Sequence, residues 1–376
     1  MADAPYDVLI VGAGPAGSAA ALAARRRSAR VLLLDRDAFP RDKACGDGIA
    51  PHALGVLAEL GVAGLTDGYP PVSSLHVVGP GGDQVTRRFN APVHTIPRAV
   101  FDDRLLRAAV AAGATVRRHR VRRLTVHEDY VDVDGISARV VIGADGAAST
   151  VRRHLGAPAN PPGHVALAIR GYAPVSPEAP HQQQIVMAGG TWPAYAWSFP
   201  IGDGRRNIGY GELLHGKSIS RTHLLDRLSV LLPHVDCSTL TRLRAHHLPL
   251  SSWRPVAGRG RLLLAGDALS LINPFTGEGI FYAVVSGALA GTAAAGGTAE
   301  AGERYAAALR YRLGRHLRHT TTLARIATKP WIVDAGVRAA RRRQASFDAL
   351  VELGLGDGLI TPRLLGSIAW DGRLRR

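Results

Sequence analysis

Short apolar runs alternate with an alanine-rich stretch at the start of the chain. Residues 7–11 (DVLIV) are mostly apolar and end at a glycine-rich turn, residues 15–27 are rich in alanine, and residues 30–34 are apolar again. Apolar runs of this length are typical of strands that are buried on both faces of a parallel sheet. The pattern therefore predicts a strand–helix–strand unit with short connections.

The same alternation returns further along the chain. Residues 99–112 predict a helix because their large apolar side chains recur near one face. Strand-like alternation follows over residues 121–142, and a third apolar run at residues 262–265 precedes a helix rich in glycine and alanine, predicted over about 276–295. These segments extend the parallel unit into an α/β domain.

Two intervening segments differ in character. Residues 73–96 and 165–248 are richer in alternating, aromatic and β-branched residues, which favours an antiparallel sheet. A proline-rich stretch over residues 157–163 marks the crossing between the two lobes. After residue 303 the chain is arginine-rich and predicted to be helical.

Composition indicates a folded protein without a membrane span. The chain has 376 residues, of which 46% are hydrophobic and 20% are charged, which is ordinary for a globular protein. We find no uninterrupted apolar stretch long enough to cross a bilayer, and the first residues lack the basic segment of a signal peptide. The two cysteines, Cys45 and Cys237, cannot form a disulfide framework and lack metal-site spacing. We therefore expect a cytoplasmic protein with no metal site.

The formal net charge of +16 has two interpretations. It indicates an anionic partner, such as a diphosphate substrate, an acidic lipid surface or an acidic electron carrier. Alternatively it reflects codon bias, because only three of the 46 basic residues are lysines. The arginine-rich segment 338–343 is a candidate for contact with anionic lipid, with a solvated helix face as the alternative. The basic residues are scattered without a recognised binding motif, so we expect no nucleic-acid partner.

A glycine motif joins the first strand to the first helix. Gly12, Gly14 and Gly17 form G-x-G-x-x-G, and Asp35 ends the second strand. This context is the one that a dinucleotide-binding fold requires. The first glycine permits the tight turn, the second lets the backbone approach a pyrophosphate, and the third allows close packing of helix and strand. The helix beginning near Pro15 offers free N–H groups to the phosphates, and Asp35 would accept a hydrogen bond from the adenosine ribose.

Two later segments are similar to the second and third flavin motifs of the p-hydroxybenzoate-hydroxylase-like superfamily. They are residues 143–150 (GADGAAST), and residues 266–268 (GDA) followed by 273–280 (NPFTGEGI). This resemblance implies FAD rather than NAD as the bound nucleotide. Asp267 can accept a hydrogen bond from a ribityl hydroxyl, and Gly277 and Gly279 open a helix whose N-terminus can face the electron-rich side of the flavin ring.

Two further segments resemble one branch of that superfamily, the geranylgeranyl reductase family. Residues 43–48 (KACGDG) resemble its K-x-C-G-G/D-G stretch. Residues 195–202 (YAWSFPIG), followed by Ile208 and Gly209, resemble its Y-x-W-x-F-P-x-G…V-G motif. The likeness covers roughly residues 6–300 and fades in the helical tail.

The resemblance and the apolar pattern together give a domain plan. We expect an α/β fold with a Rossmann-like FAD-binding domain, an inserted antiparallel β-sheet substrate domain and a helical C-terminal tail. The expected boundaries are 1–72, 97–157 and 249–300 for the discontinuous FAD-binding domain, 73–96 and 158–248 for the β-rich substrate domain, and 301–376 for the C-terminal helical region.

The cofactor candidates come from these motifs. Arg98 matches an arginine that lies near the adenosine side of FAD in the superfamily, and Asp145 is expected to hold a loop between the lobes. The candidate cofactor-binding residues are Gly12, Gly14, Pro15, Ala16, Gly17, Asp35, Arg36, Lys43, Cys45, Gly46, Arg98, Asp145, Gly266, Asp267, Pro274, Gly277, Gly279 and Ile280.

The candidate chemistry lies on a strand and on one loop. Tyr195, Trp197 and Phe199 fall on one strand face, where they form either core packing or an aromatic wall for an apolar substrate. With Pro200 they are the candidate substrate-binding residues, and Cys45, Tyr195 and Trp197 are the candidate catalytic residues. Cys45 is either a small half-buried hydrophobe or, as the resemblance implies, part of the active site near the flavin.

The resemblance implies reduction of a carbon–carbon double bond in an apolar substrate of isoprenoid or similar type. Hydride comes from reduced flavin, and a nearby acid or water supplies the proton. The sequence holds no second strand–G-x-G-x-x-G–helix unit, so the electron donor must dock transiently, as NAD(P)H or as reduced ferredoxin. The expected partners are thus the apolar substrate, possible contacts with an acidic electron carrier and with a membrane surface, and no nucleic acid.

Two other functions stay open at this point. Residues 195–200 faintly resemble the W-x-W-x-I-P segment of flavin halogenases, which makes a flavin monooxygenase or halogenase-like enzyme the first alternative. Those enzymes need a catalytic lysine, for which Lys43 is the candidate nearby. In the second alternative the bound FAD is structural and the pocket directs a non-redox cyclisation. Fold alone does not decide between these chemistries.

Overall fold

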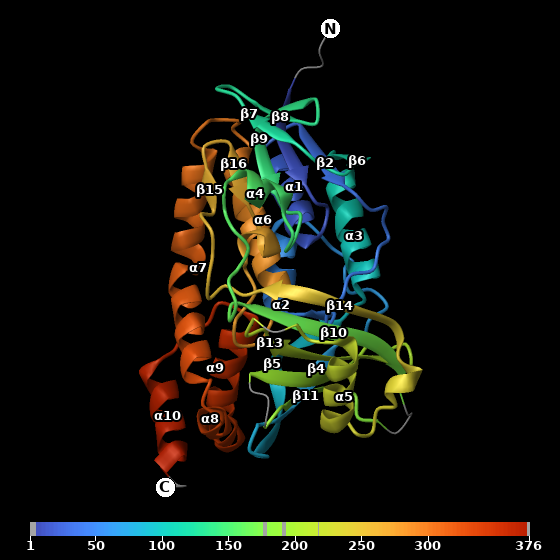
Figure 1. Cartoon of the computed structure of the whole chain (residues 1–376), viewed down its shortest axis with the longest axis vertical. Helices are drawn as coiled ribbons and strands as arrows, with labels where there is room; N and C mark the ends of the chain where they lie inside the picture. The colour runs from blue at the N-terminus through green and yellow to red at the C-terminus, as the bar shows by residue number, and fades with distance from the viewer. Residues whose placement is uncertain (1–4, 176–178, 190–192, 217, 374–376) are drawn as a thin grey trace.

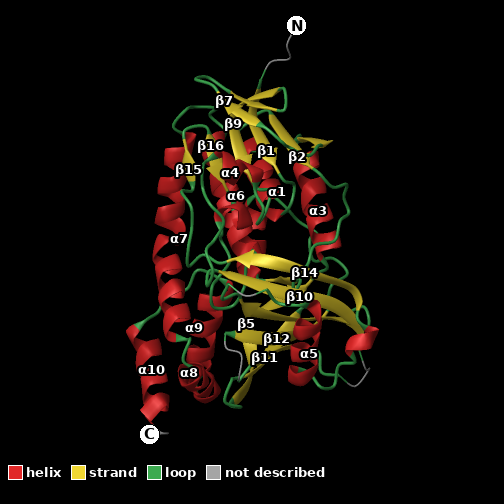
Figure 2. Cartoon of the chain, viewed as in Figure 1, coloured by secondary structure: helices red, strands yellow, loops and turns green. Residues whose placement is uncertain are grey.

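The protein is built around two sheets, which lie toward opposite ends of the computed structural model (Figure 1). The structure describes residues 5–175, 179–189, 193–216 and 218–373. The N-terminal strands belong to one sheet, and the chain ends beside the other, next to a group of C-terminal helices (Figure 2). The long helix α7 lies along one side of the molecule and reaches from beside the first sheet to the other C-terminal helices (Figure 1).

The first sheet has a parallel centre with buried strands. β1 pairs in parallel with β2 and with β9, and β16 pairs in parallel with β9. A short hairpin of β7 and β8 extends β9 in antiparallel fashion. The strands of this sheet are β1 (Tyr6–Val11), β2 (Val31–Asp35), β6 (Thr115–Arg118), β7 (Leu124–Val126), β8 (Val131–Val133), β9 (Ile136–Gly143), β15 (Gly258–Arg259) and β16 (Leu262–Leu264).

Helices cover this sheet, and two of them touch through glycine. α1 and α6 pack so closely that a Cβ added at Gly287 would lie 2.1 Å from the backbone oxygen of Ala16. A Cβ at Gly291 would similarly lie 2.0 Å from the oxygen of Ala20, so this approach requires residues without side chains. The helices beside the first sheet are α1 (Pro15–Arg25), α2 (Pro51–Glu59), α3 (Arg98–Ala111), α4 (Thr150–His154) and α6 (Ile280–Ala294), with a 3-10 turn η2 (Gly266–Leu269).

The second sheet is mainly antiparallel, with one parallel pairing of β11 and β4. Helix α5 (Arg221–Leu231) packs against β13 and β10 over a small apolar core that includes Ile169, Ile208 and Leu228. The strands, in sheet order, are β14 (Thr241–Pro249), β10 (Val165–Pro174), β13 (Arg205–Leu213), β12 (Ala194–Pro200), β11 (Gln183–Met187), β4 (Val72–Val78), β5 (Gln84–Thr95) and β3 (Gly48–Ile49). A 3-10 turn, η1 (Cys237–Thr239), precedes β14.

The C-terminal helices join the second sheet to the rest of the protein. α8 and α9 contact β5, where Phe89 of the sheet meets Phe347 of α9 with ring centroids 6.1 Å apart. Arg87 of β5 donates hydrogen bonds to the carbonyls of Ala340 and Arg341 at the end of α8. The helices are α7 (Ala301–Ile326), α8 (Pro330–Arg342), α9 (Gln344–Leu355) and α10 (Pro362–Arg373).

The α/β fold with an added mainly antiparallel sheet is confirmed, whereas two element boundaries differ from expectation. The helix predicted from about residue 276 begins at Ile280, because Gly277 has φ +73° and Asn273 Oδ1 accepts the N–H of Phe275, which holds a turn. The alternation over residues 121–142 forms three strands, β7, β8 and β9, and a turn at Asp134 and Gly135 joins β8 to β9. None of the helices within the described ranges is long and apolar enough to cross a membrane.

Candidate active site

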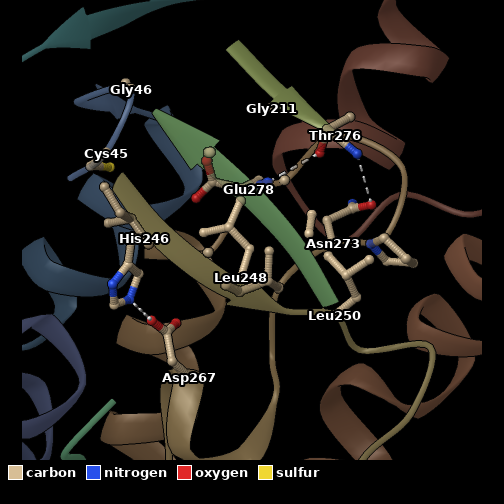
Figure 3. A pocket seen from close by; sticks show the side chains of 18 of the residues that line it. Cys45, Gly46, Gly211, His246, Leu248, Leu250, Asp267, Asn273, Thr276 and Glu278 are labelled. Atoms are coloured by element: carbon tan, nitrogen blue, oxygen red, sulfur yellow. Dashed lines mark hydrogen bonds and ion pairs between the residues drawn. The ribbon is translucent and has the colours of Figure 1, made fainter. Parts of the chain in front are cut away.

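One large cavity lies between the two sheets and continues to the C-terminal helices. Its volume is about 1160 Å³, larger than the roughly 300–1,000 Å³ of most small-molecule pockets. Its lining includes the glycine turn after β1, the loop before β3, the strand β12, the turn before α6, and helices α7 to α10. Figure 3 shows Cys45, Glu278 and Thr276 around this space. The cavity is therefore wide enough for a dinucleotide and a second molecule.

The end of the cavity at β1 is a dinucleotide cradle. Gly12 has φ +100°, and a Cβ there would lie 2.3 Å from the carbonyl oxygen of Ala144. The backbone N–H of Ala13 donates to Asp35 Oδ2 at 2.7 Å, which joins the ends of β1 and β2. No side chain caps the N-terminus of α1, and Gly14 and the first residues of α1 line the cavity. This arrangement offers backbone N–H groups and the positive end of the helix dipole to a pyrophosphate.

A second part of the cradle surrounds Asp267. Lys43 Nζ lies 2.9 Å from Asp267 Oδ2. His246 Nε2 lies 4.0 Å from the same oxygen, and Figure 3 shows these two side chains facing each other. Burial opposes ionisation of this carboxyl, but Lys43 and His246 hold the pKa of Asp267 below its usual value. Burial lowers the pKa of His246 to about 4, so its imidazole is neutral at pH 7.

His246 Nε2 is an orphaned polar atom. It is buried and has no hydrogen-bond partner within the described part of the chain. Leaving such an atom unpaired costs about 1–3 kcal/mol. A polyhydroxyl group lying along Asp267 would supply a partner to both residues, which is what the ribityl chain of FAD offers.

The turn before α6 forms the floor of the central part of the cavity. Glu278 Oε1 accepts the N–H of Phe281 at 2.8 Å, so the carboxyl lies at the N-terminus of α6. Burial raises the pKa of Glu278 to about 7, although the backbone N–H groups of Phe281 and Ile280 oppose this rise. Glu278 also lines the cavity. It is thus a carboxylic acid that is partly protonated at neutral pH, a state suited to proton transfer.

The loop that carries Cys45 is fastened to the second sheet by a buried arginine. Arg170 of β10 is 1% exposed, and its guanidinium donates to Asp42 Oδ1 at 2.5 Å. The same guanidinium donates to the carbonyls of Lys43 and Cys45 at 2.8 and 3.3 Å. One side chain of the second sheet therefore fixes the backbone of the loop that borders the first sheet.

A second buried group holds the same loop from its other end. Asp47 Oδ2 accepts hydrogen bonds from Tyr172 Oη at 2.6 Å and from Asn207 Nδ2 at 2.7 Å. Asn207 also donates to the carbonyl of Cys45 at 2.9 Å and accepts from Trp197 Nε1 at 2.8 Å. Burial raises the pKa of Asp47 to about 6, although nearby Arg170 and the two donors oppose the rise.

Cys45 lines the cavity from this loop, and it is a thiol rather than a thiolate. Burial raises the pKa of Cys45 above its ordinary value, although Arg98 opposes the rise. A low thiol pKa is the mark of a cysteine nucleophile. The environment of Cys45 therefore favours contact with a ligand or weak proton donation over nucleophilic attack.

The three aromatic side chains of β12 all line the cavity. Tyr195 Oη donates to the carbonyl of Thr276 at 2.5 Å, which links β12 to the turn before α6. A Cβ at Gly46 would lie 3.4 Å from both Phe199 and the indole nitrogen of Trp197, so these rings lie against the Cys45 loop. Because the indole N–H of Trp197 is engaged by Asn207, Trp197 contributes shape and positioning rather than a proton.

The remaining residues expected from the sequence fall in different places. Arg98 lines the cavity and forms a bidentate ion pair with Asp102 at 2.6 and 2.7 Å. Asp145 also lines it, and its carboxylate accepts from Ser149 Oγ and Thr150 N at the start of α4. The described lining includes Arg36, Gly46, Pro274, Gly277, Gly279 and Ile280, but not Gly17, Gly266 or Pro200.

Gly17 and Gly266 serve packing around the cradle. A Cβ at Gly17 would lie 1.8 Å from the oxygen of Gly12, and one at Gly266 would lie 3.1 Å from Ala16 Cβ. Pro200 ends β12 opposite Arg206. In the part of the chain that the structure describes, no group of three His, Cys, Asp or Glu residues is arranged to hold a metal ion.

Beyond the cradle the cavity becomes an apolar arm. This arm runs between the sheet strands β4, β5 and β11 on one side and helices α7, α8 and α9 on the other. Its walls include Leu75, Val77 and Ile185 from the sheet and Val337, Phe347 and Leu350 from the helices. Apolar walls on both sides suit a long hydrocarbon chain.

Comparisons with known proteins agree with the cradle. A family model described as an FAD binding domain matches residues 5–196. A menaquinone reductase from Mycolicibacterium smegmatis is 34% identical over 311 residues, which cover 76% of this chain and 75% of that protein. Digeranylgeranylglycerophospholipid reductase 1 from Methanopyrus kandleri is 34% identical over 318 residues, which cover 77% of this chain and 80% of that protein. The chain belongs to the geranylgeranyl reductase family of FAD-dependent oxidoreductases.

Solved structures agree with the fold of this family. A geranylgeranyl bacteriochlorophyll reductase-like protein from Thermoplasma acidophilum matches with a TM-score of 0.80 and 20% identity, over 97% of this chain and 96% of that one. A flavin-dependent brominase matches with a TM-score of 0.69 and 17% identity, over 98% of this chain and 94% of that one. The expected Rossmann-like FAD-binding fold and the family resemblance are confirmed.

FAD fits the residues that are present. The open glycine turn with Gly14 and Asp35 suits the adenosine diphosphate part, and the unpaired His246 beside Asp267 suits the ribityl hydroxyls. The turn with Gly277 and Gly279 leaves room for the isoalloxazine ring next to the Cys45 loop and the aromatic face of β12. Sequence analysis missed Arg170, the Asp47 group and the acidity of Glu278, because each depends on burial and on contacts between strands.

Tyr172→Phe tests the group that holds Asp47. The substitution removes one of the two donors to a buried carboxylate, so we expect the free energy of unfolding to fall by about 1–3 kcal/mol at pH 7. Tyr172 stabilises the charged form of Asp47, whose pKa is about 6, so the loss should shrink as the pH falls below 6 and Asp47 takes up a proton. Urea unfolding at several pH values measures both effects.

Tyr311→Phe is the matched control, because Tyr311 is 92% exposed on α7. Its free energy of unfolding should stay within about 0.5 kcal/mol of the parent protein at every pH. Equal effects of the two substitutions, or a loss at Tyr172 that grows toward low pH, would contradict the role given to Asp47.

Proposed function

We propose that this protein reduces carbon–carbon double bonds in the polyisoprenyl chain of a lipid. The observation that carries this proposal is the apolar arm, which is continuous with the FAD cradle and lies between β4, β5, β11 and the C-terminal helices. The relatives named above act on menaquinone and on digeranylgeranylglycerophospholipid, and both molecules carry a long isoprenoid chain. An arm with apolar walls gives such a chain a place to lie with one double bond at the flavin.

The reaction adds a hydride and a proton to an alkene, and bound FAD supplies the hydride once it is reduced. The two electrons come from a donor that docks transiently, either NAD(P)H or reduced ferredoxin. The net charge of +16 favours an acidic ferredoxin, since opposite charge raises the rate of encounter.

Residues of this chain would enclose the reacting end of the substrate and supply its proton. Tyr195, Trp197 and Phe199 would wall the substrate beside the flavin and exclude water, and Cys45 would contact it from the opposite loop. We assign the proton to Glu278, because it lines the cavity at the turn before α6 and has a pKa of about 7. The pKa of Tyr195 is raised by burial and its hydroxyl proton is engaged by Thr276, which makes it a poorer donor.

Anaerobic mixing separates this function from its alternatives. Reduced enzyme without oxygen should be reoxidised once per double bond when a geranylgeranyl lipid is added, and mass spectrometry should find the lipid two hydrogens heavier. A monooxygenase or halogenase would require oxygen before any product appears. A non-redox cyclase would form product of unchanged mass with oxidised enzyme. A halogenase role is also disfavoured because Lys43, the candidate lysine, is ion-paired with Asp267.

Gly336→Phe tests whether the chain occupies the apolar arm. Gly336 lies on α8 and lines the cavity, and a Cβ there would meet only Leu350 Cδ1 at 3.9 Å, so a larger side chain can enter the arm. We expect kcat/KM for a four-unit isoprenoid to fall by about tenfold or more, while that for a one-unit substrate changes little. Gly336→Ala is the control, and its kcat/KM for both substrates should stay close to that of the parent enzyme. Equal losses for long and short chains would refute this binding mode.

Glu278→Gln tests the proton donor. With the parent enzyme, the anaerobic rate of substrate reduction should be constant below pH 7 and fall as the pH rises through about 7, because only protonated Glu278 can donate. Glutamine cannot donate this proton, so the rate should fall by about 10²-fold or more and lose that pH dependence. Glu303→Gln, on the exposed start of α7, is the control. If the substitution weakens FAD binding but leaves the pH profile unchanged, Glu278 is structural.

A further inference from the structure

Large apolar side chains are exposed together where the C-terminal helices end. Trp331 is 54% exposed at the start of α8, and Trp370 is 66% exposed near the end of α10. Leu365 of α10 is 48% exposed and Ile326 at the end of α7 is 39% exposed. Tryptophan is seldom left this open on a protein surface. We call residues 325–331 together with Arg363, Leu365 and Trp370 the helical tip.

The parts of the helical tip lie side by side. α8 and α10 contact each other, and a Cβ at Gly372 would lie 3.6 Å from the ring of Trp331. Leu364 and Leu323 share a buried apolar cluster, which brings the start of α10 to the end of α7. In Figure 1, α8 and α10 lie at the end of the molecule away from the first sheet. The exposed apolar side chains of the three helices are therefore neighbours at this end of the molecule.

The apolar arm of the cavity reaches this tip. Thr321, Ala324 and Arg325 recur along one face of α7, and together with Thr328, just after that helix, they line the cavity. Arg325 and Thr328 are also exposed to solvent. Residues that belong both to the lining and to the surface mark an opening, so the arm opens between the end of α7 and the start of α8. The mouth of an apolar cavity thus adjoins the exposed tryptophans.

The C-terminal part of the sequence is strongly basic. Residues 310–376 contain fourteen Lys or Arg and five Asp or Glu. Arg325, Lys329 and Arg363 are exposed on the tip, and none of the ion pairs among the described side chains involves them. Exposed tryptophan flanked by basic residues is typical of a surface that enters the headgroup region of an anionic bilayer. A second copy of this chain is less favourable as the partner of the tip, because the basic residues of the two copies would repel each other.

We propose that the helical tip docks on an anionic lipid bilayer and admits a polyisoprenyl chain from the membrane directly into the apolar arm. The identity of the admitted chain rests on the proposed function, whereas the docking does not. Trp331 and Trp370 enter the interface, and Lys329 and Arg363 contact anionic headgroups. The mouth beside Arg325 and Thr328 then opens toward the acyl region, so the lipid never crosses water.

Vesicle sedimentation of the FAD-loaded full chain tests the docking. The protein should sediment with vesicles of phosphatidylcholine and phosphatidylglycerol, and much less with phosphatidylcholine alone. Replacing both tryptophans (Trp331→Ser with Trp370→Ser) should weaken binding by about tenfold or more. Lys329→Gln with Arg363→Gln should remove most of the preference for phosphatidylglycerol. Tyr311→Ser, at a site 92% exposed on α7 but outside the tip, should bind as the parent does.

Measurements of lipid reduction then distinguish membrane docking from the proposed reaction. The double tryptophan variant should reduce vesicle-borne lipid about tenfold more slowly or worse, yet reduce a short water-soluble isoprenoid at the parent rate. If the parent binds vesicles but reduces no lipid, the docking stands and the proposed function fails. Absence of vesicle binding, or equal binding by parent and variant, overturns the docking. So does a parent that is dimeric in analytical ultracentrifugation while the variant is monomeric.

Discussion

The site depends on one buried guanidinium, that of Arg170. Its contacts to Asp42, and to the carbonyls of Lys43 and Cys45, tie a loop that follows the first sheet to a strand of the second. Lys43 from that loop then reaches Asp267, which follows β16 of the first sheet. An unpaired guanidinium at 1% exposure would be very costly, so its ion pair is available only when the two sheets hold this spacing. Arg170 therefore links the cradle to the second sheet, which carries the aromatic side chains of β12.

The parts of the site that sequence analysis predicted are those that depend on local backbone geometry. Gly12 needs a positive φ and a close neighbour, and Asp35 ends its strand beside the same turn, so a short motif specifies both. The antiparallel segments were likewise visible as alternation. Such features can be predicted because their cause lies within a few residues of their position.

What sequence analysis missed depends on register and burial across the fold. Arg170 stands opposite Gly209 in β13, and it is this pairing that turns its side chain to the Cys45 loop. The positions of Arg170 and Gly209 in the sequence do not indicate this pairing. Glu278 belonged to a recognised motif, yet its raised pKa follows from enclosure by distant segments. The C-terminal helices were predicted as helices, but helical periodicity does not tell which sheet they cover or that they wall a cavity.

The same helices are hydrogen-bonded to the turn before α6, which carries Glu278. Asn273 Nδ2 donates to the carbonyl of Leu353, and Thr276 Oγ1 donates to that of Gly354, both at the end of α9. Tyr282 of α6 hydrogen-bonds His316 of α7 at 2.7 Å in the same interior. A displacement of α9 by an arriving chain must therefore either break buried hydrogen bonds or move the turn that carries Glu278. The first costs about 1–3 kcal/mol for each orphaned group, so these hydrogen bonds couple the position of α9 to that of the turn before α6.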